Sequence, residues 1–165
     1  IFEHPMWPDD PSLYVCAPSV TDPSVAPPGQ ENLFVLVPIA AGLPDTPEQR
    51  QIYRNKILEL IEKMMNIPDL RSHIITEELF CVRDFETRYN SLGGSALGLA
   101  HTLRQTATFR PNNISKKVKG LYYVGANTNP GIGMPMVIAS AELVYKRLYG
   151  IKSPKPLEKL ESKSL

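Results

Sequence analysis

The chain has 165 residues, of which 42% are hydrophobic and 21% charged, and its formal net charge is +1. This composition supports a packed core, and the near-zero charge gives no reason to expect nucleic acid as a partner. Cys16 and Cys81 are the only cysteines. Because they are far apart and the histidines are scattered, we expect neither a disulfide scaffold nor a metal site. With no secretory signal visible, we expect an intracellular protein.

The first part of the chain predicts two short strands and a helix. Residues 12–16 and 32–37 are β-prone runs that could pair across a proline-rich connection. Thr46 is a favourable N-cap and Pro47 suits the first helical position. Apolar residues then recur at helical spacing, so we predict a helix over residues 46–66.

The next segment is less regular. Asp84 could cap a short helix that ends at Tyr89. Residues 92–100 are rich in glycine and alanine, which favours a loop. A boundary between two parts of the chain is expected near Thr106.

The most informative segment is Gly120 to Pro135. Residues 120–124 predict a buried strand of the kind found inside a parallel α/β sheet. A glycine-rich loop follows, and then a helix over Met134 to Tyr149, with Pro135 at its first position and Gly150 as the C-cap. The glycine spacing matches neither a phosphate loop nor the dinucleotide pattern, so an ordinary strand-to-helix turn and a ligand loop both remain open.

Several stretches, taken in order, resemble the second half of bacterial- and fungal-type phytoene desaturases. They are Ser12–Val15, Thr21–Gly29, Leu33–Pro38, Arg104–Asn113 and Leu121–Ala141. The resemblance covers about residues 10–150 and is strongest to the fungal enzymes. These proteins belong to the amine-oxidase-like superfamily of flavoproteins.

The resemblance implies an α/β fold, α+β within this chain, that forms the C-terminal part of a two-domain, FAD-binding, Rossmann-like flavoprotein. Residues 1–106 would be part of the substrate-binding domain and residues 107–150 the C-terminal segment of the FAD-binding domain. Residues 151–165 would be a basic, disordered tail. The family's nucleotide-binding glycine motif has no counterpart here, so the N-terminal half of the same polypeptide would be a partner.

By motif match, one group of residues would line the flavin: Gly125, Ala126, Gly131, Gly133, Met134, Pro135 and Met136. A second group would contact the substrate, although core packing is the alternative for its apolar members: Phe34, Leu97, Leu99, Phe109 and Arg110. No catalytic residue is identified. Asn129 stands where many relatives have histidine, and Ala126 cannot serve as the acid that related flavoenzymes often place near the ribityl group.

The resemblance further implies FAD-dependent desaturation of phytoene to carotenes of the neurosporene or lycopene type, by hydride transfer to the flavin. So apolar a substrate implies peripheral contact with a membrane, and a homo-oligomer is possible. We expect the segment alone to be inactive. The alternatives are a flavin-dependent carotenoid isomerase or another oxidase of the superfamily, and a non-catalytic interaction domain.

Overall fold

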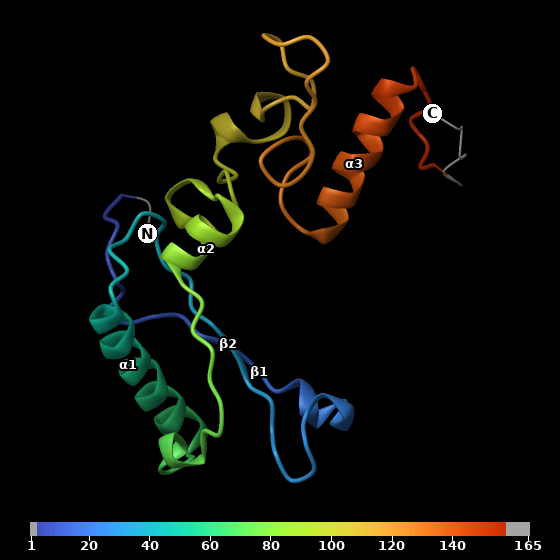
Figure 1. Ribbon diagram of the computed structural model, residues 1–165. Coiled ribbons are helices and arrows are strands. Elements are labelled where there is room, and N and C mark those ends of the chain that lie inside the picture. The colour runs from blue at the N-terminus through green and yellow to red at the C-terminus, as the bar shows by residue number, and fades with distance from the viewer. Residues whose placement is uncertain (1–2, 158–165) are drawn as a thin grey trace. The chain divides into compact units, whose positions relative to one another are not determined.

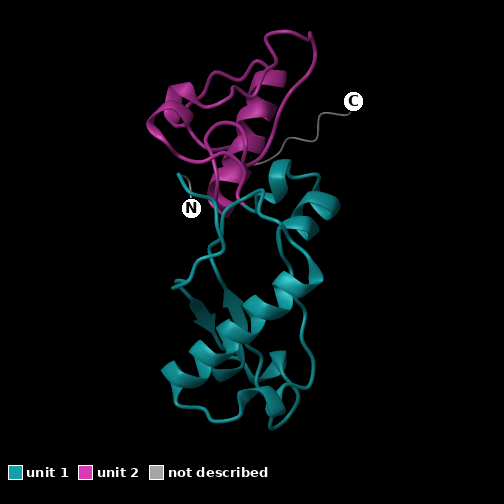
Figure 2. Cartoon of the chain, turned by 90° about the vertical axis from the view of Figure 1, so that its left-hand side faces the viewer, with its two compact units in different colours: residues 1–96 teal, residues 97–165 magenta. Residues whose placement is uncertain are grey.

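The computed structural model describes residues 3–157 (Figure 1). The helices and strands, in chain order, are β1 (Tyr14–Cys16), β2 (Phe34–Leu36), α1 (Pro47–Met65), α2 (Val82–Tyr89) and α3 (Met134–Leu148). Short 3-10 turns connect them. The chain divides into two compact units, residues 1–96 and residues 97–165 (Figure 2).

In the first unit, β1 and β2 form an antiparallel pair, as the sequence predicted. Val15 faces Val35 across the ladder, and Cys16 faces Phe34. Side chains alternate between the two faces of a strand. Both valines pack against the core formed by α1, so the ribbon has one face on the core.

Helix α1 confirms the predicted helix over residues 46–66. The Thr46 hydroxyl accepts a hydrogen bond from the backbone N–H of Gln49 at 3.2 Å, which caps the first turn. The helix ends at Met65, and Asn66 caps it with a left-handed φ of 53°. Tyr53, Ile57 and Ile61 lie on its buried face.

Helix α2 is fixed by an ionic cluster at its start. Asp45 accepts hydrogen bonds from Arg50 and from the backbone N–H of Arg83. The helix begins at Val82 rather than at Asp84, so the predicted cap is corrected. Asp84 lies in the first turn, where its carboxylate accepts from the N–H of Cys81 at 2.8 Å.

In the second unit, α3 confirms the predicted last helix. Gly150 has a φ of 66°, and the N–H of Ile151 bonds to the carbonyl of Lys146 at 2.8 Å, which closes the helix end. Pro135 is the second helical residue rather than the first, because the helix begins at Met134.

The predicted buried strand over residues 120–124 is wrong for this structure. Tyr122 makes a single antiparallel bridge to Ile114, and the side chains of Tyr123 and Val124 are 45% and 55% exposed. Within residues 3–157 the sheet is the β1–β2 pair, so the parallel sheet of an α/β fold is absent there and the α+β expectation fits better. A parallel strand needs hydrogen-bonded neighbours on its edges, and residues 120–124 have none of that kind.

The interior of the second unit is mostly polar. Among its described residues, Val144 is the one buried hydrophobic side chain. Five buried residues are polar or charged: Arg110, Asn113, Thr128, Ser140 and Lys146. Hydrogen bonds rather than apolar packing therefore hold this unit together. The domain boundaries expected from the resemblance stay predictions, and residues 158–165 of the expected tail lie outside the described residues.

Candidate functional site

The glycine loop opens toward solvent at two of its three glycines. Gly125, Gly131 and Gly133 have φ values of 111°, 138° and 108°, a region that favours glycine. A Cβ added at Gly125 or Gly133 would meet no atom within 4 Å. The backbone there can be approached closely by a ligand.

The loop leads directly into the start of α3. Gly133 is the N-cap residue, and no side chain caps the helix. The first-turn N–H groups of Met134 and Met136 precede the first intrahelical bonds, and both residues are exposed. Unpaired N–H groups and the helix dipole favour an electron-rich ligand at this end.

The stretch of sequence that contains the loop carries charged side chains of positive sign only. Residues 97–141 contain no aspartate or glutamate, whereas they include Arg104, Arg110, Lys116, Lys117 and Lys119. No carboxylate of this stretch competes for the helix start. This stretch of the sequence therefore places no like charge against an electron-rich group at the helix start.

Arg110 holds the back of the loop. Its guanidinium is buried, with the residue 2% exposed. It donates to the carbonyls of Thr128 at 3.2 Å, Gln105 at 3.0 Å and Leu99 at 3.2 Å, and also to that of Ala126. These four hydrogen bonds engage all three guanidinium nitrogens, so the side chain holds four backbone carbonyls in place. The predicted contact of Arg110 with substrate stays a prediction.

Asn113 and Ser140 bind the loop through its backbone groups. Both are fully buried. The amide of Asn113 donates to the carbonyls of Tyr123 and Asn129 and to the hydroxyl of Ser140. That hydroxyl also accepts from the N–H of Gly125 at 3.1 Å.

A second contact region lies where residues 98–101 meet the loop. The N–H of Leu99 donates to the side chain of Asn127 at 3.0 Å. A Cβ on Gly98 would lie 2.1 Å from the same Asn127 oxygen, so the close approach requires glycine. The Gly-rich segment expected to be a loop is therefore packed against the candidate site.

The structure brings the predicted flavin-lining residues together. All seven belong to the loop or the first turn of α3, where Met134 is 83% and Met136 41% exposed. Of the predicted substrate residues, Leu97 and Phe109 are 65% and 70% exposed in the same unit. Phe34 lies in the first unit and is 53% exposed. Exposure is compatible with ligand contact, and the assignment of each residue to a ligand stays a prediction.

Sequence reasoning missed Asn113, Ser140 and Thr128 as supports of the loop. The sequence does offer one signal: polar residues precede and follow the glycine loop, as Asn113 and Ser140 do. Their burial depends on tertiary contacts between residues 110–113, the loop and α3, and no local pattern reveals those contacts.

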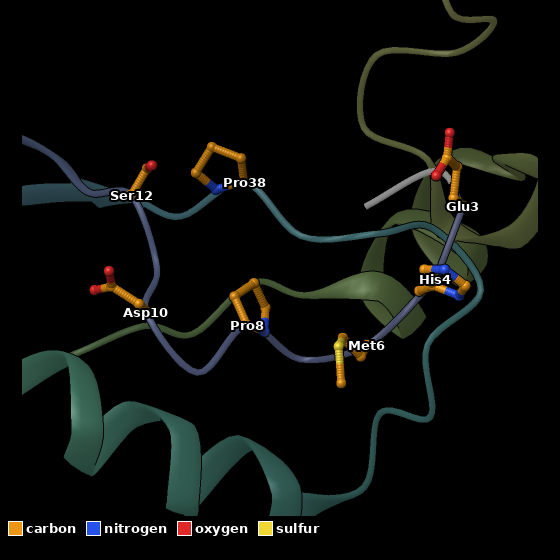
Figure 3. A pocket seen from close by; sticks show the side chains of 7 residues that line it. All are labelled: Glu3, His4, Met6, Pro8, Asp10, Ser12 and Pro38. Carbon is orange, nitrogen blue, oxygen red and sulfur yellow. The ribbon is translucent and has the colours of Figure 1, made fainter.

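Other features of the described residues lie apart from this loop. Figure 3 shows a hollow in the first unit whose lining includes Glu3, His4 and Asp10, and none of the predicted site residues is among its lining. No described helix combines the length and apolarity needed to cross a membrane. Residues 3–157 contain no group of His, Cys, Asp and Glu side chains suited to hold a metal ion.

Comparison with known proteins places these features in context. No family model matches the chain. A carotenoid 3,4-desaturase from Haloarcula japonica is 58% identical over 142 residues, which are 86% of this chain and 28% of that protein. A 4,4'-diapophytoene desaturase from Staphylococcus haemolyticus is 40% identical over 141 residues, and that from Staphylococcus aureus is 40% identical over 147 residues.

The chain spans only about 28% of the length of these relatives. The expectation that the likeness is strongest to fungal enzymes is corrected, because the 58% identical relative is archaeal. The expected resemblance to desaturases that act on carotenoids is confirmed, whereas the expectation of phytoene as the substrate stays a prediction. The chain is therefore similar in sequence to a segment of carotenoid desaturases.

Proposed function

We propose that this chain is the part of a FAD-dependent carotenoid desaturase that contributes one wall of the flavin site. The observation that carries the proposal is the open glycine loop leading into the uncapped start of α3. It occurs in a chain that is 58% identical over 142 residues to a carotenoid 3,4-desaturase. The relatives' length supports the idea that other parts of a longer chain complete the site.

Three features of this chain suit a flavin. Gly125 and Gly133 leave the backbone open, so a planar ring or a ribityl chain can approach it closely. The N–H groups of Met134 and Met136 are donors at the positive end of a helix. Pro135 lacks an N–H and so leaves no unsatisfied donor between them. When bound, FAD supplies the two-electron acceptor for removal of hydrogen from a carbon–carbon single bond.

The proposed substrate class is a long apolar carotenoid. Phytoene is the first substrate to test, as the sequence motifs imply. The name of the 58% identical relative makes 3,4-desaturation of a carotenoid a second possibility within the same chemistry. Because such substrates dissolve in membranes and not in water, we also propose that the intact protein is intracellular and associates peripherally with a membrane.

The outer face of the β1–β2 ribbon is apolar and exposed, which favours contact with an apolar ligand in the first unit. Tyr14, Phe34 and Leu36 share this face and are 57%, 53% and 45% exposed. The rings of Tyr14 and Phe34 meet edge to face with centroids 6.4 Å apart. An exposed aromatic cluster is what an apolar polyene would contact, and we propose Phe34 as its anchor.

The decisive experiment replaces Gly133 in the full-length protein. Valine at a φ of 108° is strained, and its branched side chain would enter the space left open for the ligand. Gly133→Val should therefore abolish retention of FAD, read as the ratio of flavin absorbance to protein absorbance. Gly120→Val is the matched control, because Gly120 has a φ of 80° and equally open surroundings but lies outside the loop.

A Gly133→Val protein that keeps full flavin occupancy would contradict the loop assignment. Product analysis with phytoene separates desaturation from the alternatives. Longer-wavelength chromophores indicate desaturation, whereas an unchanged number of double bonds indicates an isomerase. A full-length protein without flavin would support the non-catalytic alternative.

A further inference from the structure

Asn113 has an unusual place for an amide side chain. It is 0% exposed, and its Nδ2 lies 3.2 Å from the Tyr123 carbonyl, 2.9 Å from the Asn129 carbonyl and 3.1 Å from the Ser140 hydroxyl. Tyr123 and Asn129 bracket the first part of the glycine loop. One buried amide therefore holds both ends of residues 123–129.

The orientation of this amide is set by a charge. Arg147, near the end of α3, donates to the Asn113 Oδ1 at 2.5 Å. Because a guanidinium can only donate, the oxygen of the amide must face Arg147 and the NH2 group must face the loop. The NH2 group therefore serves as the donor to the loop carbonyls, and an acceptor at that position could not replace it.

Ser140 extends the same network to Gly125. Its hydroxyl oxygen accepts from Asn113 Nδ2 and from the N–H of Gly125, each at 3.1 Å. Ser140 belongs to α3, whose first turn forms the other side of the candidate site. Asn113 and Ser140 thus tie the loop to the helix whose start faces the ligand.

We propose that Asn113 is a positioning residue for the flavin and acts on it only through Ser140 and the loop backbone. This inference rests on the proposed function of the loop. The network fixes the distance between Gly125 and the helix start, and those two groups approach the cofactor together. Ligand contacts need placement to about 0.5 Å, so a small displacement of the loop is sufficient to weaken them.

The sharpest variant is Asn113→Asp in the full-length protein. Aspartate has nearly the same shape and keeps an oxygen for Arg147, but it presents an acceptor to the carbonyls of Tyr123 and Asn129, which cannot donate. We expect the Kd for FAD to rise by about tenfold or more, because buried polar groups are left without donors. Asn112→Asp is the matched control: the same chemical change, one residue away, at an exposed position.

A second measurement, the reduction potential of the bound flavin, distinguishes a role in positioning the cofactor from a role in the stability of the fold alone. Where flavin is still bound, its reduction potential should fall in Asn113→Asp, because the helix start stabilises the reduced, negatively charged ring less well once the loop has moved. The potential in Asn112→Asp should equal that of the parent. A change confined to the melting temperature, with parental Kd and potential, would overturn the inference.

Ser140→Ala keeps the proposal testable if Asn113→Asp fails to fold. It removes one hydroxyl and leaves the Gly125 N–H without its acceptor, so we expect the Kd to rise about three- to tenfold. Ser153→Ala, at an exposed serine, is its control. Parental Kd and potential in Ser140→Ala would overturn the inference. A parent protein that binds no FAD would overturn the proposed function itself, which distinguishes the two failures.

Discussion

The imidazole of His101 lies directly against Gly131. A Cβ added to Gly131 would lie 2.6 Å from the His101 Cε1 and 2.8 Å from its Nε2. Gly131 is itself buried and has a φ of 138°. Both the contact and the backbone conformation therefore require glycine, and the segment around His101 is packed against the loop at this point.

We predict that Gly131→Ala destabilises the full-length protein by about 1–3 kcal/mol, because alanine is strained at this φ and collides with the ring. His101→Ala in the same background should relieve the collision but not the strain. Urea unfolding of the two single variants and the double variant gives the coupling between them. Strictly additive effects would show that the ring does not constrain Gly131.

Arg110 is the second constraint on the loop, and lysine cannot replace it. Lysine offers one compact ammonium group, whereas the three guanidinium nitrogens of arginine donate to four separate carbonyls. We predict that Arg110→Lys lowers the free energy of unfolding by about 2–4 kcal/mol.

The matched control for this change is Arg104→Lys, at an exposed arginine of the same unit. It should change stability by less than about 0.5 kcal/mol. Thermal melting of both variants beside the parent checks the prediction. Equal melting temperatures for the two variants would contradict a structural role for Arg110.

The sequence predicted α1 well because its signals are local. A cap at Thr46, a proline in the first turn and apolar residues at helical spacing all lie within one segment. The roles of Arg110 and Asn113 could not be predicted in the same way. Both read as residues of a turn, and only the approach of residues 123–129 and of α3 makes them buried.

Residues 120–124 show a different limit. Their apolar pattern predicts a segment buried on both faces, yet Tyr123 and Val124 are exposed here. A sequence pattern reports what a segment prefers to contact, whereas a strand also needs neighbours to pair with. The predicted fold class failed at this segment for that reason.

Asp45 makes the stability of the first unit dependent on pH. Burial raises the pKa of Asp45, but hydrogen bonds from Arg50 and from the N–H of Arg83, with the charge of Arg50, outweigh it and lower the pKa below its usual value. A carboxyl with a lowered folded-state pKa stabilises the fold above its unfolded pKa of about 3.9. That contribution is lost as the pH falls through the folded-state value.

We therefore predict that unfolding of the first unit becomes easier below about pH 4, and that Asp45→Asn flattens this dependence. The same variant should lower stability by about 1–3 kcal/mol at pH 7, because the partly buried Arg50 loses one of its two carboxylate partners and keeps only Asp84. Asp10→Asn, at an exposed position, is the control. Urea unfolding at pH 3, 5 and 7 gives the comparison, and parallel pH profiles for the parent and Asp45→Asn would contradict the prediction.

The exposed face of α3 yields the last prediction. Met134 and Ile138 are 83% and 70% exposed on the helix, while Val144 is the one buried hydrophobic residue among the described residues of the second unit. An apolar helix face beside a polar interior suits a segment that packs against something larger. Since the chain spans about 28% of its relatives' length, we predict that the remaining length covers this face in the full-length protein.

Ile138→Lys distinguishes a covered face from an exposed one by the sign of its effect. In the isolated segment it should raise solubility, because it breaks an exposed apolar patch. In the full-length protein it should lower stability by about 2–4 kcal/mol, because a lysine would be buried without a partner. Ile52→Lys is the control, since Ile52 is 65% exposed on α1 and a lysine there should remain in water. If Ile138→Lys leaves the melting temperature of the full-length protein unchanged, the face is open to solvent and the predicted packing is wrong.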